Sequence, residues 1–205
     1  VRVEGVAKTF HLGFFRKRVD AVHDVSFTVR QGEIFGLLGP NGAGKTTTLK
    51  IMMSLIRPTR GRIRVLDMTV PDRRIYRSLG FLPENPYFYE YLDPTEFLMF
   101  AGALFAIPRD QRRKRTQELL ERVGLAEAAK RPLRKFSKGM LQRLGIAQAL
   151  VNRPRILVLD EPMSGLDPIG RREVRDLILE LRDAGTTILF SSHILSDVEM
   201  ICDRV

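Results

Sequence analysis

The sequence predicts an α/β fold with a mostly parallel sheet, an N-terminal antiparallel β region and an inserted helical lobe. Three features of the 205-residue chain support this fold class. Short apolar runs alternate with stretches of helical periodicity, which is typical of strand–helix units and a parallel sheet. The N-terminal region is rich in β-forming residues and is interrupted by an apparent insertion at His11–Arg18. The interval from about Asp93 to Val151 contains helical patterns and no strand candidate.

The individual elements follow from these patterns. The expected strands are short apolar runs: Ile34–Leu38, Ile63–Leu66, Leu79–Leu82, Ile156–Asp160 and Thr187–Ser191. The first and the last two are apolar at most positions, as in strands buried on both faces. Helical patterns occupy Lys45–Leu55, Pro94–Ala106, Asp110–Val123, Lys138–Val151, Pro168–Arg182 and Ile194–Ile201.

Composition excludes several classes of protein. Hydrophobic residues make up 44% and charged residues 28%, so the chain is neither fibrous nor wholly disordered. The one cysteine, Cys202, cannot form an internal disulfide, which favours a reducing, cytoplasmic compartment. The longest apolar stretch, Phe97–Ile107, is too short to span a bilayer, and the N-terminus has no apolar signal region. We expect one domain over residues 1–205 that is truncated at Val205.

The net charge is unusual. The chain has 34 basic and 24 acidic residues, a formal charge of +10, which indicates an anionic partner such as a nucleotide, a nucleic acid or a membrane surface. More than half of this excess lies between Arg109 and Lys135, where there are ten basic and four acidic residues. The excess therefore belongs to the helical lobe. Most of these basic side chains fit an ordinary solvated helix face. We expect the others to form a surface that faces the membrane.

A glycine-rich segment follows the first apolar strand and precedes a helical pattern. Residues 39–46 fit G-x-x-x-x-G-K-[ST] in the context that this motif requires, and the alternative is a glycine-rich turn with an incidental lysine. Backbone N–H groups of such a loop surround phosphates. Lys45 is expected to reach the β and γ phosphates, and the Thr46 hydroxyl to coordinate Mg²⁺. The expected nucleotide-binding residues of this P-loop NTPase core are Gly39, Pro40, Asn41, Gly42, Ala43, Gly44, Lys45, Thr46 and Thr47.

Polar side chains follow two further buried strands. Asp160 and Glu161 end one of them, and neighbouring side chains at a strand end can take separate roles. We expect Asp160 to hold Mg²⁺ through its water shell and Glu161 to deprotonate the attacking water, which is worth about 10²–10⁴-fold in rate. His193 follows the other strand and would reach the γ phosphate from the same sheet edge. The alternative for Asp160 and Glu161 is an ordinary solvated strand end. The alternative for His193 is a packed or helix-capping histidine.

At this point the chain resembles the nucleotide-binding domain of ATP-binding cassette (ABC) transporters. The resemblance is carried by segments in the family's order: Gly39–Thr47, Phe81–Glu84, Phe136–Met140, Ile156–Pro162, Ser164–Asp167 and Ser192–His193. It implies that two such domains pair head-to-tail and enclose two ATP molecules. The phosphate loop of one domain then faces the signature segment of the other.

Two segments depart from the family's usual pattern. The signature reads Phe-Ser-Lys-Gly-Met instead of Leu-Ser-Gly-Gly-Gln, and the resemblance places Ser137, Lys138, Gly139 and Met140 against the ATP of the partner subunit. Ser137 can cap the following helix, and Gly139 leaves room for a phosphate. Glu84 stands where a glutamine usually links Mg²⁺ to the transmembrane partner. Together these departures resemble the bacterial branch that exports drugs, antibiotics, lipids or ions.

The resemblance also implies two further roles. An aromatic side chain stacks on adenine, and Phe10 is the closest match, with Phe14 and Phe15 as competitors and an ordinary packing role for Phe10 equally open. Asp167 resembles the residue that couples the two sites across the dimer.

The expected function is therefore an ATP-hydrolysing subunit at the cytoplasmic face of the cell membrane. Its implied partners are a second ABC ATPase subunit, in a homodimer or heterodimer, and transmembrane permease subunits. The alternative is a soluble ABC ATPase that acts on nucleic acid or the ribosome, which the positive charge favours. Such proteins carry long coiled coils between the phosphate loop and the signature, or two cassettes, and this chain has neither feature. We expect neutralisation of Arg112, Arg113 and Arg115 to weaken membrane or partner docking while ATP affinity holds.

Overall fold

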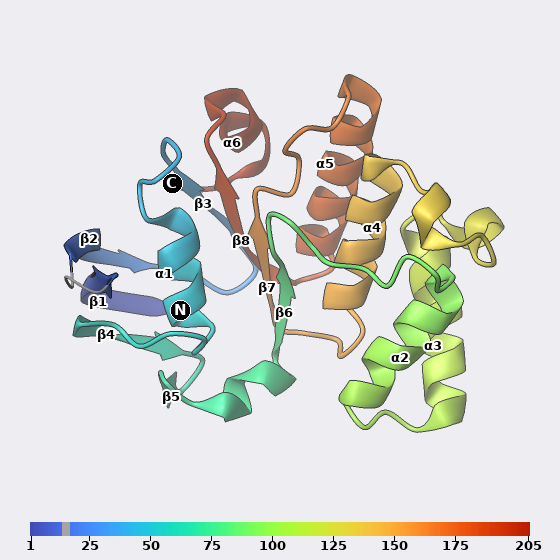
Figure 1. Ribbon diagram of the computed structural model, residues 1–205, viewed down its shortest axis with the longest axis horizontal. Coiled ribbons are helices and arrows are strands. Elements are labelled where there is room, and N and C mark those ends of the chain that lie inside the picture. Colours follow the sequence, from blue (N-terminus) through green and yellow to red (C-terminus); the bar gives the residue numbers. More distant parts are fainter. Residues whose placement is uncertain (14–16) are drawn as a thin grey trace.

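The computed structural model describes residues 1–13 and 17–205. Within this part of the chain, one parallel and one antiparallel sheet lie on the two sides of a helix, and further helices cover the outer face of the parallel sheet (Figure 1). The predicted α/β class with an antiparallel N-terminal region and a helical lobe is confirmed. None of the helices in the described ranges is both long enough and apolar enough to cross a bilayer.

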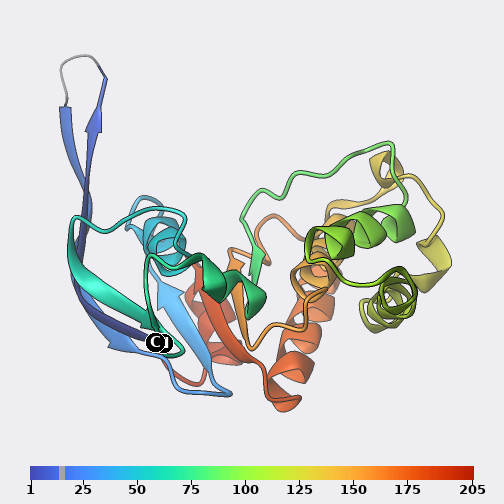
Figure 2. The same ribbon diagram turned by 90° about the horizontal axis from the view of Figure 1, so that it is seen from below.

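The antiparallel sheet has the strand order β2-β1-β4-β5. Its strands are β1 (Arg2–Leu12), β2 (Lys17–Thr28), β4 (Arg60–Val65) and β5 (Met68–Thr69). The two ends of the expected insertion at His11–Arg18 belong to the β1–β2 ladder, because His11 pairs with Arg18 and Leu12 with Lys17. This hairpin projects well beyond the body of the molecule (Figure 2).

The strand expected at Ile63–Leu66 joins this antiparallel sheet and not the parallel one. In β4 the buried side chains of Ile63 and Val65 alternate with exposed arginines. Such alternation is typical of a sheet with one solvated face, whereas strands buried on both faces are apolar throughout. The period-two pattern of this segment thus indicates its place in the fold.

The parallel sheet has the strand order β3-β8-β7-β6. Its strands are β3 (Ile34–Leu38), β6 (Leu79–Leu82), β7 (Ile156–Asp160) and β8 (Thr187–Ser192). Every residue of β7 and β8 is buried, which agrees with their apolar sequences. Because all these strands run the same way, the segments that follow β3, β7 and β8 meet at one edge of the sheet.

Six α-helices accompany the sheets in the described residues. They are α1 (Lys45–Met52), α2 (Pro94–Leu104), α3 (Arg109–Arg122), α4 (Lys138–Ala149), α5 (Pro168–Asp183) and α6 (Leu195–Ile201). Three short 3₁₀ helices are η1 (Arg73–Arg77), η2 (Ala126–Ala128) and η3 (Leu133–Lys135). Helix α2 begins with a capping box, in which Asp93 accepts from Glu96 N (2.8 Å) and Glu96 accepts from Asp93 N (3.0 Å).

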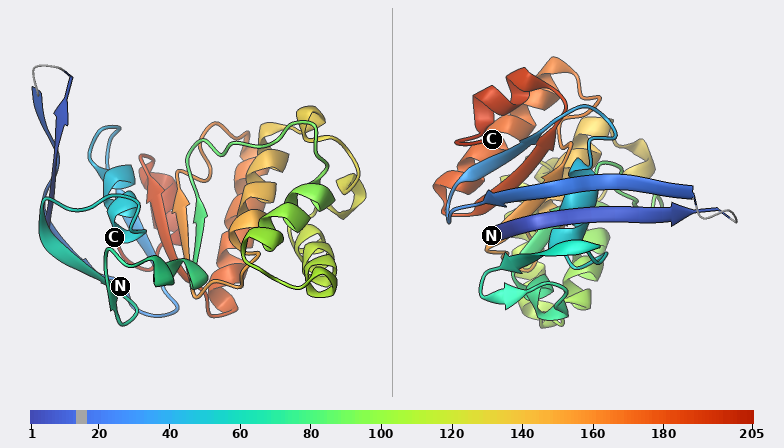
Figure 3. Two further views of the ribbon diagram at one scale, coloured as in Figure 1. Left: turned by 60° about the horizontal axis from the view of Figure 1, so that its bottom comes forward. Right: turned by 90° about the vertical axis from the view of Figure 1, so that its left-hand side faces the viewer.

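Alternate residues of the parallel sheet enter two apolar clusters. Leu157 and Leu159 face the cluster that contains α4, α5, α6 and the lobe helices α2 and α3. Ile156 and Val158 face the cluster that contains α1 and the antiparallel sheet. Helix α1 therefore lies between the two sheets, as Figure 3 shows. The signature helix α4 and the phosphate-loop helix α1 cover opposite faces of the parallel sheet.

Two of the three arginines expected to dock on a membrane or partner also make hydrogen bonds within the lobe. Arg112 Nη1 donates to Met99 O (3.2 Å), and its stem packs on α2 at Gly102, where an added Cβ would lie 3.1 Å from Arg112 Cγ. Arg115 Nη2 donates to Leu150 O (2.7 Å) at the end of α4. Only Arg113 of the three is exposed. The sequence pattern could not separate these roles, because all three arginines lie on one short stretch of helix.

Candidate nucleotide-binding site

The predicted catalytic side chains meet at the carboxyl edge of the parallel sheet. Lys45 follows the loop after β3, Glu161 follows β7 and His193 follows β8. The loop after β3 is tied to β8, because Gly39 N donates to Ser192 O (3.3 Å). Three segments that are distant in the sequence therefore converge because parallel strands end at one edge.

The phosphate loop needs glycine at two positions. Gly42 and Gly44 have φ of 85° and 88°, in the left-handed region that favours glycine. An added Cβ on Gly44 would also lie 2.2 Å from Ala21 O, so the loop packs directly on β2. In the described structure no side chain caps the N-terminus of α1, and its first turn has no acidic residue. The N–H groups of this turn, which includes Thr46 and Thr47, are suited to an anion.

Lys45 and Glu161 form an ion pair inside the site. Lys45 Nζ lies 3.2 Å from Glu161 Oε1, and both side chains are less than one-tenth exposed. The same ammonium donates to Gly39 O (2.7 Å) and Pro40 O (3.2 Å). Lys45 is therefore held between the phosphate loop and the end of β7.

Glu161 is also paired with His193. His193 Nδ1 donates to Glu161 Oε2 (2.9 Å), which leaves the other ring nitrogen of this exposed histidine free of that contact. Glu161 has a φ of 51°, which is unusual for a residue with a side chain and is typical of strained functional sites. Lys45, Glu161 and His193 thus form one connected cluster, as their strand-end positions predicted.

Ser191 is a site residue that the sequence reasoning missed. Its hydroxyl donates to Asp160 Oδ1 (2.6 Å) and accepts from Glu161 N (2.9 Å). Ser191 and Asp160 are both almost fully buried. This one hydroxyl fixes both neighbouring acidic residues, and the available signal was a polar residue at the end of an otherwise apolar strand.

The oxygen donors predicted for Mg²⁺ differ in their surroundings. Asp160 is buried with one oxygen bonded to Ser191, Thr46 lies in the first turn of α1, and Glu84 is exposed after β6. Hydroxyl and carboxylate oxygens suit Mg²⁺, which usually takes one or two protein carboxylates together with phosphate oxygens. The residue types therefore fit this ion.

The signature segment lies apart from the phosphate loop (Figure 1). Ser137 caps α4, because its Oγ accepts from Met140 N (3.3 Å). An added Cβ on Gly139 would meet nothing within 4 Å, so open space adjoins this helix N-terminus. Lys138 lies over Gly165, since an added Cβ there would be 2.2 Å from Lys138 Nζ. The segment is accessible to a second molecule but does not face its own phosphate loop.

The remaining predicted residues have mixed surroundings. Phe10 is half-buried on β1, and Lys8 Nζ lies 4.9 Å from its ring centroid. Its predicted competitors, Phe14 and Phe15, lie outside the described residues. Asp167 is exposed and caps α5 by accepting from Gly170 N (3.0 Å).

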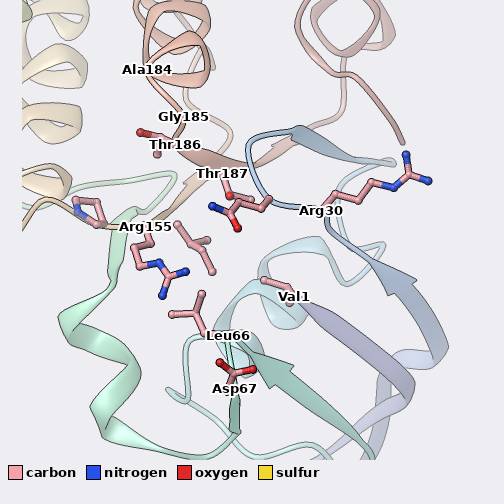
Figure 4. A pocket seen from close by; sticks show the side chains of 12 residues that line it. Val1, Arg30, Leu66, Asp67, Arg155, Ala184, Gly185, Thr186 and Thr187 are labelled. Atoms are coloured by element: carbon pink, nitrogen blue, oxygen red, sulfur yellow. The ribbon is translucent and has the colours of Figure 1, made fainter.

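A separate cavity of about 490 Å³ lies at the amino ends of the parallel strands (Figure 4). Arg155 and Thr187 line it, and Thr187 Oγ1 accepts from Gly32 N (2.9 Å). It contains none of the predicted site residues. The candidate chemistry belongs to the opposite, carboxyl edge of the sheet.

Comparisons with known proteins agree with this arrangement. A family model described as ABC transporter matches residues 22–164. An ABC transporter ATP-binding protein of Nostoc sp. is 53% identical over 208 aligned positions, which cover 100% of this chain and 62% of that protein. The bacitracin transport ATP-binding protein BcrA of Bacillus licheniformis is 43% identical over 188 positions, which cover 90% of this chain and 60% of BcrA.

Solved structures are similar as well. The ATP-binding cassette MJ0796, in a dimeric post-hydrolysis state bound to ADP and Pi, matches with a TM-score of 0.86 and 26% identity over 97% of this chain and 90% of that chain. The present chain spans about three fifths of the length of the curated relatives it matches. Since the family model covers most of the chain and the fold agrees with a solved cassette, the chain belongs to the ABC transporter family.

Proposed function

We propose that this chain is the ATP-binding and ATP-hydrolysing part of an ABC transporter subunit. The observation that carries the proposal is the cluster in which the buried Glu161 side chain contacts both Lys45 and His193 beside the phosphate loop. A carboxylate, an ammonium and an imidazole at a helix N-terminus are the groups needed to bind a triphosphate and activate water.

Each group has a distinct part in this reaction. The loop N–H groups and Lys45 bind phosphate oxygens. When Lys45 binds them, it gives up part of its contact with Glu161. Glu161 then accepts a proton from the attacking water, and His193 orients the Glu161 carboxylate through Nδ1. Thr46, Asp160 and Glu84 would hold Mg²⁺, which would neutralise phosphate charge there.

A second copy of the cassette completes the site. Ser137, Lys138, Gly139 and Met140 lie at an open helix N-terminus that does not reach this chain's own phosphate loop. A head-to-tail dimer brings the segment against the ATP of the partner, with Asp167 near the contact and Phe10 against adenine. The dimeric state of the MJ0796 cassette supports this arrangement.

A transmembrane subunit is the proposed second partner. An apolar groove of about 250 Å³ separates the lobe from the core, and its rim includes the exposed side chains of Leu55, Leu104 and Phe105. We propose that the partner docks here, at the cytoplasmic face of the membrane, and that the exposed Arg113 faces lipid headgroups. The unusual signature, Glu84 and the similarity to BcrA support an exporter of a drug or antibiotic.

The soluble alternative, an ABC ATPase that acts on nucleic acid, loses part of its support. It rested on the positive charge of the chain, more than half of which lies in the lobe, and two arginines of that region are engaged in internal hydrogen bonds. Salt-sensitive binding of the full-length protein to RNA or DNA would favour it again.

The proposed activity is tested by Glu161→Gln in the full-length protein. Steady-state ATP hydrolysis should fall at least about 100-fold, because the proton acceptor is lost, while ATP binding is retained. Glu127→Gln, on the exposed η2 helix, removes the same charge away from the site and should be neutral. Unchanged hydrolysis in Glu161→Gln would overturn the proposal.

A further inference from the structure

Asp197 is a buried carboxylate that has no part in the proposed chemistry. It lies on α6, only four positions after His193, and the residue is 4% exposed. Its partner is Arg171 on α5, whose Nη1 donates to Asp197 Oδ1 (3.4 Å). A buried acid seldom persists without a paired cation, so this contact is a specific feature of the α5–α6 interface.

The same guanidinium also contacts the Ser164–Asp167 loop. Arg171 Nε donates to Leu166 O (3.4 Å). Separately, the backbone N of Arg171 donates to Asp167 O (2.9 Å) in the first turn of α5. The planar fork of an arginine can hold two acceptors in a fixed relation. Arg171 therefore joins the loop that precedes α5 to the first turn of α6.

Asp197 also lies within electrostatic range of the catalytic pair. Burial raises its pKa, Arg171 and His193 act in the opposite direction, and the charge of Glu161 raises the pKa further. Helix α6 begins two positions after His193, so a shift of Asp197 moves the backbone that carries this imidazole. His193 in turn holds Glu161 through a 2.9 Å hydrogen bond.

We propose that Arg171 and Asp197 are positioning residues that transmit the position of the Ser164–Asp167 loop to the His193–Glu161 pair. Contact of a second cassette with the exposed Asp167 end of the loop displaces Leu166 O, and Arg171 carries that displacement to Asp197 and α6. The pair thereby links dimer contact to the alignment of the proton acceptor. This inference rests on the proposed function.

The test compares variants that remove a charge from the Arg171–Asp197 pair with variants that remove a charge from exposed neighbours. In the full-length protein, Asp197→Asn and Arg171→Gln should each lower kcat for ATP hydrolysis about tenfold and leave the KM for ATP within about twofold, because alignment is lost and binding is not. The matched controls are Glu199→Gln and Arg172→Gln, which alter exposed neighbours on the same two helices. Both controls should keep the wild-type kcat.

Two further measurements separate positioning from stability. The double variant Arg171→Gln/Asp197→Asn should lose no more activity than either single variant, since the two residues act as one unit. Arg171→Lys keeps the charge without the fork, so it should retain the unfolding temperature and lose part of kcat. If Asp197→Asn does not fold, the kcat of Arg171→Lys still tests the inference.

Wild-type kcat in folded Asp197→Asn or Arg171→Gln would overturn the inference. Additive losses in the double variant, or a kcat that falls only in proportion to the folded fraction, would reduce the pair to a structural contact and overturn it as well. Absence of ATP hydrolysis in the wild type and both controls would instead refute the proposed function itself.

Discussion

Lys45 Nζ lies 3.2 Å from Glu161 Oε1, so the cation expected at the phosphates is paired with the expected proton acceptor. Both side chains are buried, where an ion pair is weakly screened by solvent. ATP therefore competes with Glu161 for the same ammonium. The ion pair connects nucleotide binding to the freeing of the catalytic carboxylate.

This competition predicts the effect of Glu161→Gln on affinity. Loss of the negative charge frees Lys45 and removes repulsion of the phosphates, so ATP should bind about fivefold more tightly, or about 1 kcal/mol. Calorimetric titration of the full-length protein with ATP and Mg²⁺ measures this change. Asp176→Asn, on the exposed side of α5, is the charge-matched control. Weaker ATP binding in Glu161→Gln would contradict the competition.

Ser191→Ala should damage both stability and activity. The hydroxyl is fully buried, donates to Asp160 and accepts from Glu161 N, so its removal leaves polar groups without their partner. We expect a loss of about 1–3 kcal/mol in the free energy of unfolding and a lower kcat. Chemical denaturation and steady-state ATPase assays measure the two effects. Thr69→Ala, on the exposed edge of β5, should change neither.

The sequence predicted the catalytic edge of the sheet better than its internal contacts. The apolar runs of β7 and β8 and the glycine-rich motif are local patterns, so their strand ends and the grouping of Lys45, Glu161 and His193 were predictable. The Arg171–Asp197 contact and the role of Ser191 depend on pairs that are distant in the sequence. No single-chain pattern indicates which charged residues will meet across two helices.

The dependence on contacts between distant residues also explains why the sheet that β4 joins and the hydrogen bonds of Arg112 and Arg115 were not predicted. In β4 the period-two alternation of apolar residues with arginines distinguishes the antiparallel from the parallel sheet, whereas the apolar residues alone do not. The internal hydrogen bonds of Arg112 and Arg115 depend on the packing of α3 against α2 and α4. Their sequence neighbourhood is that of an exposed basic helix.

Gly44→Ala should be far more damaging than Gly185→Ala. Both glycines have a φ of 88°, so alanine is strained at each by about 1–2 kcal/mol. An added Cβ on Gly44 would also lie 2.2 Å from Ala21 O, whereas one on Gly185 would meet nothing within 4 Å. Gly44→Ala should therefore lose ATP binding and additional stability. Equal unfolding free energies for the two variants would show that the phosphate loop can move away from β2.

Substitutions of Arg113 and Arg115 should have different effects, the first on membrane docking and the second on the stability of the lobe. Arg115→Ala removes the hydrogen bond to Leu150 O from a side chain that is 16% exposed, which should lower the free energy of unfolding by about 1–3 kcal/mol. Arg113→Ala should leave stability unchanged and weaken binding to vesicles that contain anionic lipid, by about 1 kcal/mol per charge at the surface. Denaturation and vesicle sedimentation of the full-length protein measure the two properties. If Arg113→Ala binds vesicles as the wild type does, Arg113 does not face the membrane.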